Sequence, residues 1–336
     1  MKPHIVMISP ALANANNGNW QTASRWAHIL RQRHAVTILA SGDLRPQDLP
    51  APPDLVIALH ARRSATALQA LAERFPQVPT ILVLTGTDLY RDIRIDAAAR
   101  QTLQRADQVV VLQQAGLEEL TPEIRARTSV IHQSAPLLKP LDAGCKSRMP
   151  HFEVCMIGHL REEKDPAAFM QAATLLATPR IRLTHIGGAL DAELAAMAEA
   201  TAARHASYRW LGALPHEEAR RRLQRCHLMV IASKMEGGAN VIIEALASGV
   251  PVLASDISGN RGMLGDDYVG YFPLGDSAAL ARAIERAAGD AAYYAQLQRQ
   301  CQARAPLFAP EREQAALLDL VDNMLNSKAT HRKPSP

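Results

Sequence analysis

Two glutamates flank a glycine pair in the segment EGGANVIIEALASGVPVLAS, residues 236–255. Glu236 precedes the glycines, and Glu244 lies eight positions later, inside the pattern of an apolar helix. If Asn240 caps this helix, the free N–H groups at its start attract an anion such as a diphosphate. Carboxylates on either side accept hydrogen bonds from hydroxyl groups, so the segment predicts a site for a nucleoside diphosphate sugar. The residues expected around this ligand are Glu236, Gly237, Gly238, Ala239, Asn240, Val241 and Glu244.

Cations for the same diphosphate are expected in IGHLREEKDP, residues 157–166, which follows a predicted strand. His159, Arg161 and Lys164 lie at this strand end, where positive charge would neutralise phosphate. Both segments also have a plain interpretation, in which the glycines make an ordinary turn, Glu244 is solvated and the basic run is a surface loop. Spacing alone does not separate the two interpretations, but the agreement between the segments favours a ligand site.

A second helix start occurs early in the chain, in ANANNGNWQTASRW at residues 13–26. Gly18 and Asn19 open this helix after the first predicted strand, and such a start contacts a phosphate or a sugar when it lies at a ligand cleft. An ordinary strand-to-helix turn is the alternative. The segment contains no GxGxxG, which disfavours a nicotinamide dinucleotide, and no GxxxxGK[ST], which disfavours an ATPase.

Short apolar runs alternate with helical patterns along the chain, as in proteins built from β-α-β units around a parallel sheet. The runs are continuous in Val, Ile and Leu because such strands are buried on both faces. In the first half the expected strands are HIVMISP, AVTILAS, DLVIALH, TILVLTG and QVVVLQ, with helices at 20–32, 64–75 and 96–104. In the second half they are FEVCMIGHL, IRLTHIGG, YRWLGAL, HLMVIAS and PVLASDI, with helices between them. The predicted fold class is α/β, with two doubly wound, Rossmann-like domains.

The domain boundary is expected between Ser134 and Pro150, where proline, glycine and charge mix without a period. Ligands of open parallel sheets bind beyond the carboxyl ends of the strands, so two such sheets facing each other would enclose an active-site cleft. The predicted parts are an N-terminal, acceptor-side domain over residues 1–145, a nucleotide-sugar-binding domain over 146–309, a helix over 310–327 and a disordered tail over 328–336.

Composition narrows the setting of the protein. The chain has 336 residues, a net charge of +4 and scattered Lys and Arg residues, which gives little support for a nucleic-acid partner. Its four cysteines form no CxxC pair, and no leader-like or membrane-spanning run occurs, so we expect reduced thiols in a cytoplasmic protein without stable membrane association. Asp266 and Asp267 do not form a DxD motif, and we predict neither a metal ion nor another cofactor. A homo-oligomer is compatible with the sequence.

The arrangement of both domains resembles the GT-B glycosyltransferases with an E-x7-E motif, family 4 of the glycosyltransferase classification. The likeness is strongest over residues 153–274, and the segment 236–255 is similar to the group's E-G-F-G-x-x-x-x-E-A-x-A-x-G-x-P-V-x-A-S. The resemblance implies a metal-independent transfer in which Glu236 lies near the donor sugar, Glu244 binds the ribose and Lys164 holds the diphosphate. The catalytic residues predicted on this basis are Glu236, Lys164 and Arg161.

Two departures from this group are informative. His159 stands where the group has an arginine, which leaves Arg161 as a substitute cation, and LVLTGTDLYRD passes from Thr85 to Gly86 without the histidine usual after the fourth strand. With NNGNWQTASRWA and EGGANVIIEALASGVPVLASDISGNRGMLG, these departures are similar to the selenosugar synthases of selenoneine biosynthesis. That family couples selenophosphate to a UDP-sugar, such as UDP-N-acetylglucosamine or UDP-glucose, and forms a 1-selenosugar and UDP. The selenium substrate is implied by the resemblance alone.

A small anionic acceptor changes what the first domain must provide. It needs no general base to remove a proton, so the missing histidine matters less, but it needs cations. Arg62 and Arg91 follow predicted strands and are our candidates, while an exposed loop position explains each arginine equally well. His60, at a strand end, is either a cleft residue or a buried histidine. The predicted acceptor-binding residues are Asn17, Thr85, Thr87, Arg62 and Arg91.

Two other functions stay open at this point. One is an ordinary GT-B glycosyltransferase with an oxygen acceptor on a sugar, a lipid or a small molecule. The other is a catalytically inactive protein that binds a nucleotide sugar, in keeping with the missing histidine. Turnover of the nucleotide sugar separates the second from any enzyme.

Overall fold

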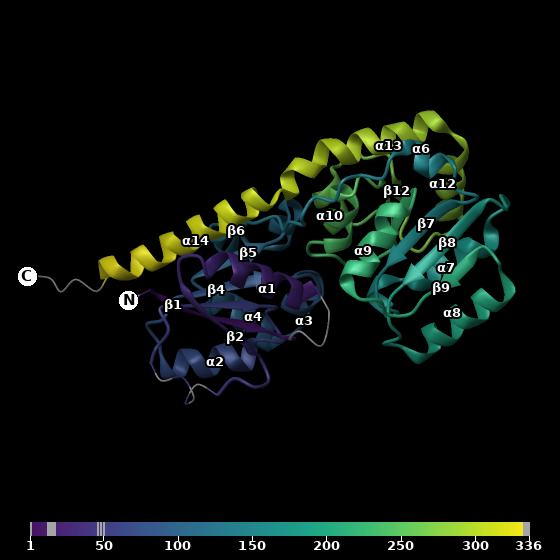
Figure 1. The fold of residues 1–336 in the computed structure, drawn as a ribbon. Coiled ribbons are helices and arrows are strands. Elements are labelled where there is room, and N and C mark those ends of the chain that lie inside the picture. The colour runs from purple at the N-terminus through teal and green to yellow at the C-terminus, as the bar shows by residue number, and fades with distance from the viewer. Residues whose placement is uncertain (1, 12–17, 46, 48, 50, 332–336) are drawn as a thin grey trace, which may run out of the picture. The chain divides into compact units, whose positions relative to one another are not determined.

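The chain folds into two compact units, each built on a six-stranded parallel sheet (Figure 1). Five strands of each sheet are the predicted apolar runs, and the sixth strand of each, β6 or β12, was not predicted. The computed structural model describes residues 2–11, 18–45, 47, 49 and 51–331, and the side chains of all of these except 143 and 328–331. The first unit comprises Met1–Gln133 and Pro310–Pro336, and the second comprises Ser134–Ala309. The sheets and their flanking helices confirm the predicted fold class.

The sheet of the first unit has the strand order β2-β1-β3-β4-β5-β6. Alternate residues of β1 point to opposite faces, so Ile5 and Met7 join one buried cluster while Val6 and Ile8 join another. Burial on both faces explains the continuous apolar runs. The strands are β1 (His4–Ser9), β2 (Ala35–Ala40), β3 (Leu55–Leu59), β4 (Thr80–Leu84), β5 (Gln108–Val111) and β6 (Thr128–Val130).

Helices cover both faces of this sheet, and the last helix of the chain is one of them. Helix α14 packs on α1 through Leu317 and Val321, and the buried Glu313 accepts hydrogen bonds from Arg25 Nε and Trp26 Nε1, both at 2.7 Å. The helical elements are α1 (Gly18–Leu30), α2 (Ala65–Arg74), η3 (Asp88–Asp92), α3 (Ile93–Ile95), α4 (Ala97–Arg105), η4 (Gln114–Glu119), α5 (Pro122–Arg125) and α14 (Pro310–His331).

Helix α14 is longer than expected. It continues to His331, in contrast to the disordered tail predicted from residue 328, because no proline or glycine interrupts the chain before Pro334.

No helix in the described part of the chain is long and apolar enough to cross a membrane.

The sheet of the second unit has the order β12-β11-β10-β7-β8-β9. The two-residue strand β12 was not expected, since a run this short shows no apolar pattern. The strands are β7 (Phe152–Ile157), β8 (Ile181–Ile186), β9 (Tyr208–Trp210), β10 (Leu228–Ile231), β11 (Val252–Ser255) and β12 (Tyr271–Phe272).

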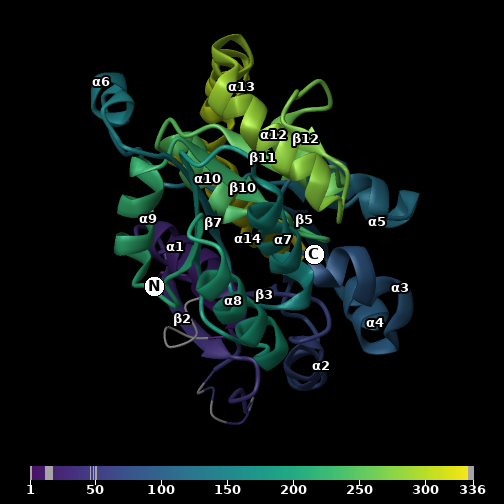
Figure 2. The same cartoon turned by 90° about the vertical axis from the view of Figure 1, so that its right-hand side faces the viewer.

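Right-handed crossovers place α7 and α8 on one face of this sheet and α9 and α10 on the other (Figure 2). Helix α12 packs on α7. The helical elements are α6 (Ala143–Ser147), η5 (Glu162–Lys164), α7 (Pro166–Leu175), α8 (Ala192–Arg204), α9 (His216–Arg225), α10 (Asn240–Ala247), α11 (Ser258–Leu264), α12 (Ser277–Gly289), α13 (Ala291–Arg304) and η6 (Ala305–Phe308).

The boundary between the units lies after Gln133, twelve residues before the one placed at 145. The segment that follows is held by the second unit: Leu138 N–H donates to Ala247 O at 3.1 Å, and Arg220 Nη2 donates to Pro136 O at 2.6 Å. Its irregular composition is typical of a linker, but these contacts make it part of the second unit.

Candidate active site

Lys164 and Glu236 meet because β7 and β10 are neighbouring parallel strands whose following loops lie at the same sheet edge. Lys164 Nζ donates to Glu236 Oε1 at 2.5 Å, and the two side chains are 19% and 9% exposed. The loops are also joined through the backbone, where Lys234 N–H donates to Glu163 O at 2.9 Å. Two of the three predicted catalytic residues thus form one largely buried ion pair.

The backbone of Glu236 is fixed by the start of helix α11. A Cβ at Gly259 would lie only 2.0 Å from Glu236 O, so no other residue fits there without moving the loop. Asn260 Nδ2 donates to Ser255 O at 2.9 Å, and Ser255 Oγ donates to Ser233 O at 2.6 Å, all among buried residues. Sequence analysis did not single out Gly259, because close approach of two backbones leaves no mark in spacing.

Asn240 was predicted to cap helix α10, but it is the first residue of the helix and not its cap. The N-cap is Ala239, whose methyl group accepts no hydrogen bond, so the first turn has no side-chain cap. Ala239 O accepts the N–H groups of Ile242 at 2.9 Å and Ile243 at 3.3 Å. An uncapped start with two preceding glycines suits an anion. Contact with a ligand stays a prediction for five residues here: Gly237, Gly238, Ala239, Asn240 and Val241.

Glu244 is paired and not solvated. Its Oε1 lies 2.7 Å from Nε2 of His216, the first residue of α9, and Glu244 is 8% exposed. The hydrogen bond to Glu244 raises the pKa of His216 against the opposing effect of burial. His216 was missed because the two residues are 28 positions apart in the chain and only the packing of α9 against α10 brings them together.

The two other residues predicted to neutralise the diphosphate, His159 and Arg161 of the β7 loop, differ in their surroundings. His159 Nδ1 accepts the N–H of Gly188 at 3.0 Å, which leaves the ring proton on Nε2. Arg161 Nε is buried and has no hydrogen-bond partner among the described residues. A buried donor without a partner favours a bound acceptor such as phosphate. Phosphate binding by either side chain stays a prediction.

In the first unit, the predicted helix start is present. Gly18 is exposed and Asn19 half-buried at the first turn of α1, where Thr22 Oγ1 donates to Gly18 O at 2.8 Å. Asn17 lies outside the described residues. A donor contact of Gly18 or Asn19 stays a prediction.

Arg62 and Arg91 are brought together by Asp92, a residue that sequence analysis did not name. Asp92 Oδ2 accepts Arg62 Nε at 2.9 Å, and Oδ1 accepts Arg91 Nε at 3.0 Å. Burial by itself would raise the pKa of Asp92, but the hydrogen bonds from Arg91 and Arg62 outweigh it and lower the pKa, so the carboxylate is charged.

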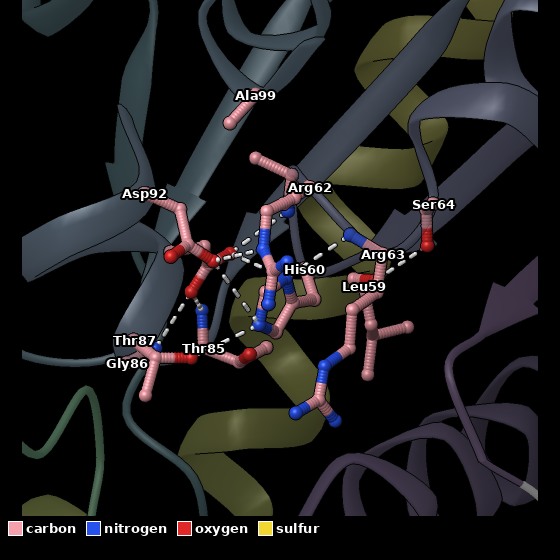
Figure 3. A network of polar contacts seen from close by, with 12 residues as sticks. Leu59, His60, Arg62, Arg63, Ser64, Thr85, Gly86, Thr87, Asp92 and Ala99 are labelled. Atoms are coloured by element: carbon pink, nitrogen blue, oxygen red, sulfur yellow. Dashed lines mark hydrogen bonds and ion pairs between the residues drawn. The ribbon is translucent and has the colours of Figure 1, made fainter. Parts of the chain in front are cut away.

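His60 and Thr87 belong to the same network (Figure 3). His60 Nε2 lies 3.0 Å from Thr87 Oγ1, and its Nδ1 accepts the N–H of Arg63 at 3.3 Å. Burial lowers the pKa of His60 against the effect of Asp88, so the imidazole is neutral near pH 7. Of the two interpretations, the buried histidine is correct, and it lies beside the predicted acceptor residues.

Asp88 ties the loops after β3 and β4 to one another. Its Oδ1 accepts the N–H groups of Thr85 and Gly86, both at 2.9 Å, and its Oδ2 accepts the N–H of Ala61 at 2.9 Å. The structure thus gathers Thr85, Thr87, Arg62 and Arg91 at neighbouring strand ends, and their binding of an acceptor stays a prediction.

Comparison with known proteins points to one class. Residues 146–306 match the family model described as "Glycosyl transferases group 1". A curated relative, phosphatidyl-myo-inositol mannosyltransferase from Mycobacterium leprae, is 53% identical over 45 residues, which span 13% of this chain and 12% of the relative.

Solved structures share the fold over nearly the whole chain. Sucrose-phosphate synthase from Thermosynechococcus elongatus aligns with a TM-score of 0.79 and 17% identity over 97% of this chain and 100% of that one. HepE from Anabaena, in complex with UDP and glucose, aligns with a TM-score of 0.75 and 17% identity over 96% of this chain and 100% of that one. The fold is that of the GT-B glycosyltransferases. Together with the group 1 match, it supports a nucleotide-sugar glycosyltransferase.

Proposed function

We propose that this protein transfers a sugar from a UDP-sugar, UDP-N-acetylglucosamine or UDP-glucose, to selenophosphate, as the selenosugar synthases (SenB) do. Selenium forms a bond to the anomeric carbon, the bond from that carbon to the diphosphate oxygen breaks, and UDP leaves with the electron pair. Hydrolysis of the Se–P bond by water then gives the 1-selenosugar and inorganic phosphate.

The pairing of Lys164 with Glu236 beside an uncapped helix start is the observation that carries the donor half of this proposal. A diphosphate takes Lys164 as its cation and the α10 start as its N–H donors, while the sugar hydroxyls donate to Glu236. Glu244 then accepts from the ribose in place of His216.

The acceptor half rests on the arginine pair of the first unit and on the similarity to the selenosugar synthases. Arg62 and Arg91 supply positive charge at strand ends, and Thr85 stands where the wider group usually has a histidine. A selenophosphate anion suits such a site because it needs charge compensation and no deprotonation.

The test is an anaerobic incubation of the protein with selenophosphate and either UDP-sugar, followed by mass spectrometry of UDP and selenium-containing sugar. Equal amounts of UDP and selenosugar are expected. Omission of selenophosphate is the control for hydrolysis by water. UDP-sugar binding without a selenium product would overturn the acceptor assignment and leave an oxygen acceptor or a binding protein.

A further inference from the structure

A cavity of about 360 Å³ lies within the second unit, between helix α9 and the strands β7, β8 and β9. This volume is in the range of small-molecule sites in proteins. The residues that line it include none of those predicted for the donor or the acceptor. The cavity therefore needs an explanation of its own.

The cavity lies over β8 and β9 because α9 packs on β7 and α10. Thr184 and Arg209 are partners in the register of β8 and β9, so both side chains point to the face with the cavity. Tyr208, the next residue along, points to the other face and packs edge-on against Phe169 of α7. The small residue Ala219 is among the few that α9 buries, and a short side chain leaves space above the sheet.

Part of the lining is apolar. Ile186 and Cys226 are buried, at 2% and 7% exposure, and Leu211 and Met149 are half-buried. A ligand with an apolar body would remove more of this surface from water, which favours its binding.

The carboxylates at the cavity already have arginine partners. Glu153 lies 3.8 Å from Arg182 Nη1. Glu218 accepts hydrogen bonds from Arg222, a lining residue, through Nε at 3.1 Å and Nη2 at 3.0 Å. These two pairs offset their own charges and leave the remaining cations of the lining without a counter-ion.

The remaining cations are Arg209 of β9 and Arg225, the last residue of α9. Neither forms a hydrogen bond or an ion pair with any residue that the structure describes. Both are exposed, and each guanidinium group has five N–H donors in a plane that matches a phosphate or a carboxylate. The cavity thus has one unpaired arginine from the sheet and one from the helix.

The cavity is separate from the proposed donor site. That site lies beyond the carboxyl ends of β7 and β10, whereas Glu153, the second residue of β7, lines the cavity. Helix α9 begins at His216, which is bonded to Glu244, and ends at Arg225. At 1.5 Å per residue these two ends are about 14 Å apart, so a nucleotide sugar at Glu244 would leave the cavity open.

We propose that this cavity is a second ligand site, for a small molecule that carries an anionic group on an apolar body. Arg209 and Arg225 hold the anion, and the apolar body lies against Ile186 and Leu211. The inference goes beyond the proposed function, in which neither the donor nor the acceptor occupies this cavity.

The test is calorimetric titration with 1-naphthyl phosphate, which has both parts of the expected ligand. Inorganic phosphate and 1-naphthol each carry one part and are the comparison ligands. All titrations contain saturating UDP, so that the phosphate does not enter the donor site. We expect 1-naphthyl phosphate to bind at least ten-fold more tightly than either comparison ligand. Equal affinity for 1-naphthyl phosphate and inorganic phosphate would overturn the inference.

Arg209→Gln and Arg225→Gln remove one cation each from exposed positions, where the fold tolerates the change. Each should weaken binding of 1-naphthyl phosphate about ten-fold and leave UDP affinity unchanged. Arg221→Gln is the matched control, because this α9 side chain is 78% exposed and does not line the cavity. The same loss in all three variants would mean that general positive charge attracts the probe, and would overturn the site.

Thr184→Trp tests the cavity itself, since the larger side chain fills part of it and changes no charge. It should weaken binding of 1-naphthyl phosphate at least ten-fold. An unchanged affinity would place the probe outside the cavity and overturn the inference. UDP affinity comes from separate titrations without the probe, so failure of the proposed donor site would appear there and not in the comparison of the variants.

Discussion

The two strand-end sites of the molecule pair their charges differently. In the second unit one lysine faces one carboxylate, and the pair of Lys164 and Glu236 is largely buried. In the first unit two guanidinium groups share the single carboxylate of Asp92, and both arginine side chains reach solvent. A one-to-one pair leaves little charge for a ligand until the ligand replaces a partner, whereas the carboxylate of Asp92 by itself offsets only one of two positive charges.

This difference indicates which ligand suits each site. A ligand at the second unit must bring a phosphate for Lys164 and hydroxyls for Glu236, since a bare oxyanion would take the lysine and leave a buried carboxylate unpaired. A nucleotide sugar brings both. The arginines of the first unit need only an anion, which suits a small acceptor.

The largest effect is expected for Glu236→Gln, which keeps the shape but removes the charge that Lys164 pairs with. Turnover of UDP-sugar should fall by about 100-fold to 1,000-fold, because a group aimed at the reacting sugar is lost. UDP release in the steady state measures it. Glu162→Gln is the control, since that side chain is 83% exposed and, among the described residues, forms an ion pair with Lys234 alone. Turnover within ten-fold of wild type would contradict a catalytic Glu236.

Substitution of Gly259 tests whether turnover depends on the position of Glu236 when its charge is kept. Gly259→Ala places a methyl group where Glu236 O lies 2.0 Å away, so the loop must move while every charge remains. We expect about a 100-fold loss of turnover, as for other small misplacements of catalytic groups. Gly289→Ala is the matched control, because an added Cβ there would meet no atom of the described residues within 4 Å beyond its own helix and chain neighbours. Equal activity in the two variants would show that the position of Glu236 is not critical.

At the first unit, Arg62→Ala should act on the acceptor alone. Loss of one charge-assisted contact should raise the KM for selenophosphate about ten-fold and leave the UDP affinity unchanged. Arg63→Ala removes the same charge one residue away, from a side chain that extends away from Asp92, and should have little effect (Figure 3). A similar change of KM in both variants would mean that general positive charge, and not the shared carboxylate, attracts the acceptor.

The smallest effect is a pH dependence of UDP binding. The hydrogen bond to Glu244 raises the pKa of His216 above its ordinary value of 6.5. In the ligand-free protein His216 therefore stays protonated at pH values somewhat above 6.5. If the ribose takes Glu244, the pKa of His216 falls and a proton is released, so UDP affinity should rise with pH from 6.5 through the raised pKa and then level off. Calorimetry in two buffers of different ionisation enthalpy measures the proton. His216→Gln should abolish the release, and an affinity that falls with pH would exclude this exchange.

The sheets could be predicted from the sequence because their signal is local. A run such as LVIAL in β3 is buried on both faces, and its apolar composition shows this without knowledge of its neighbours. The pairing of Lys164 with Glu236 was also within reach, since strands of one parallel sheet end at the same edge. Each residue lies next to the end of its own predicted strand.

The partners that were missed depend on packing between distant segments. In the sequence Asp92 lies between the predicted strand TILVLTG and the predicted helix 96–104, where no pattern marks it, and the turn at His60 brings Arg62 to it. His216 meets Glu244 through the contact of two helices whose rotation no pattern specifies. Helix α14 has an apolar stripe but no sign of which unit it covers.

Helix α14 also sets the order in which the chain can be completed during synthesis. Residues 310–331 emerge from the ribosome after the whole of the second unit. They nevertheless contribute buried side chains to the core around Trp26 in the first unit. Domains generally form as their residues appear, so Ser134–Ala309 can fold as soon as it is made. The first unit therefore completes its fold after the second, because the core around its first strands is incomplete until α14 has been synthesised.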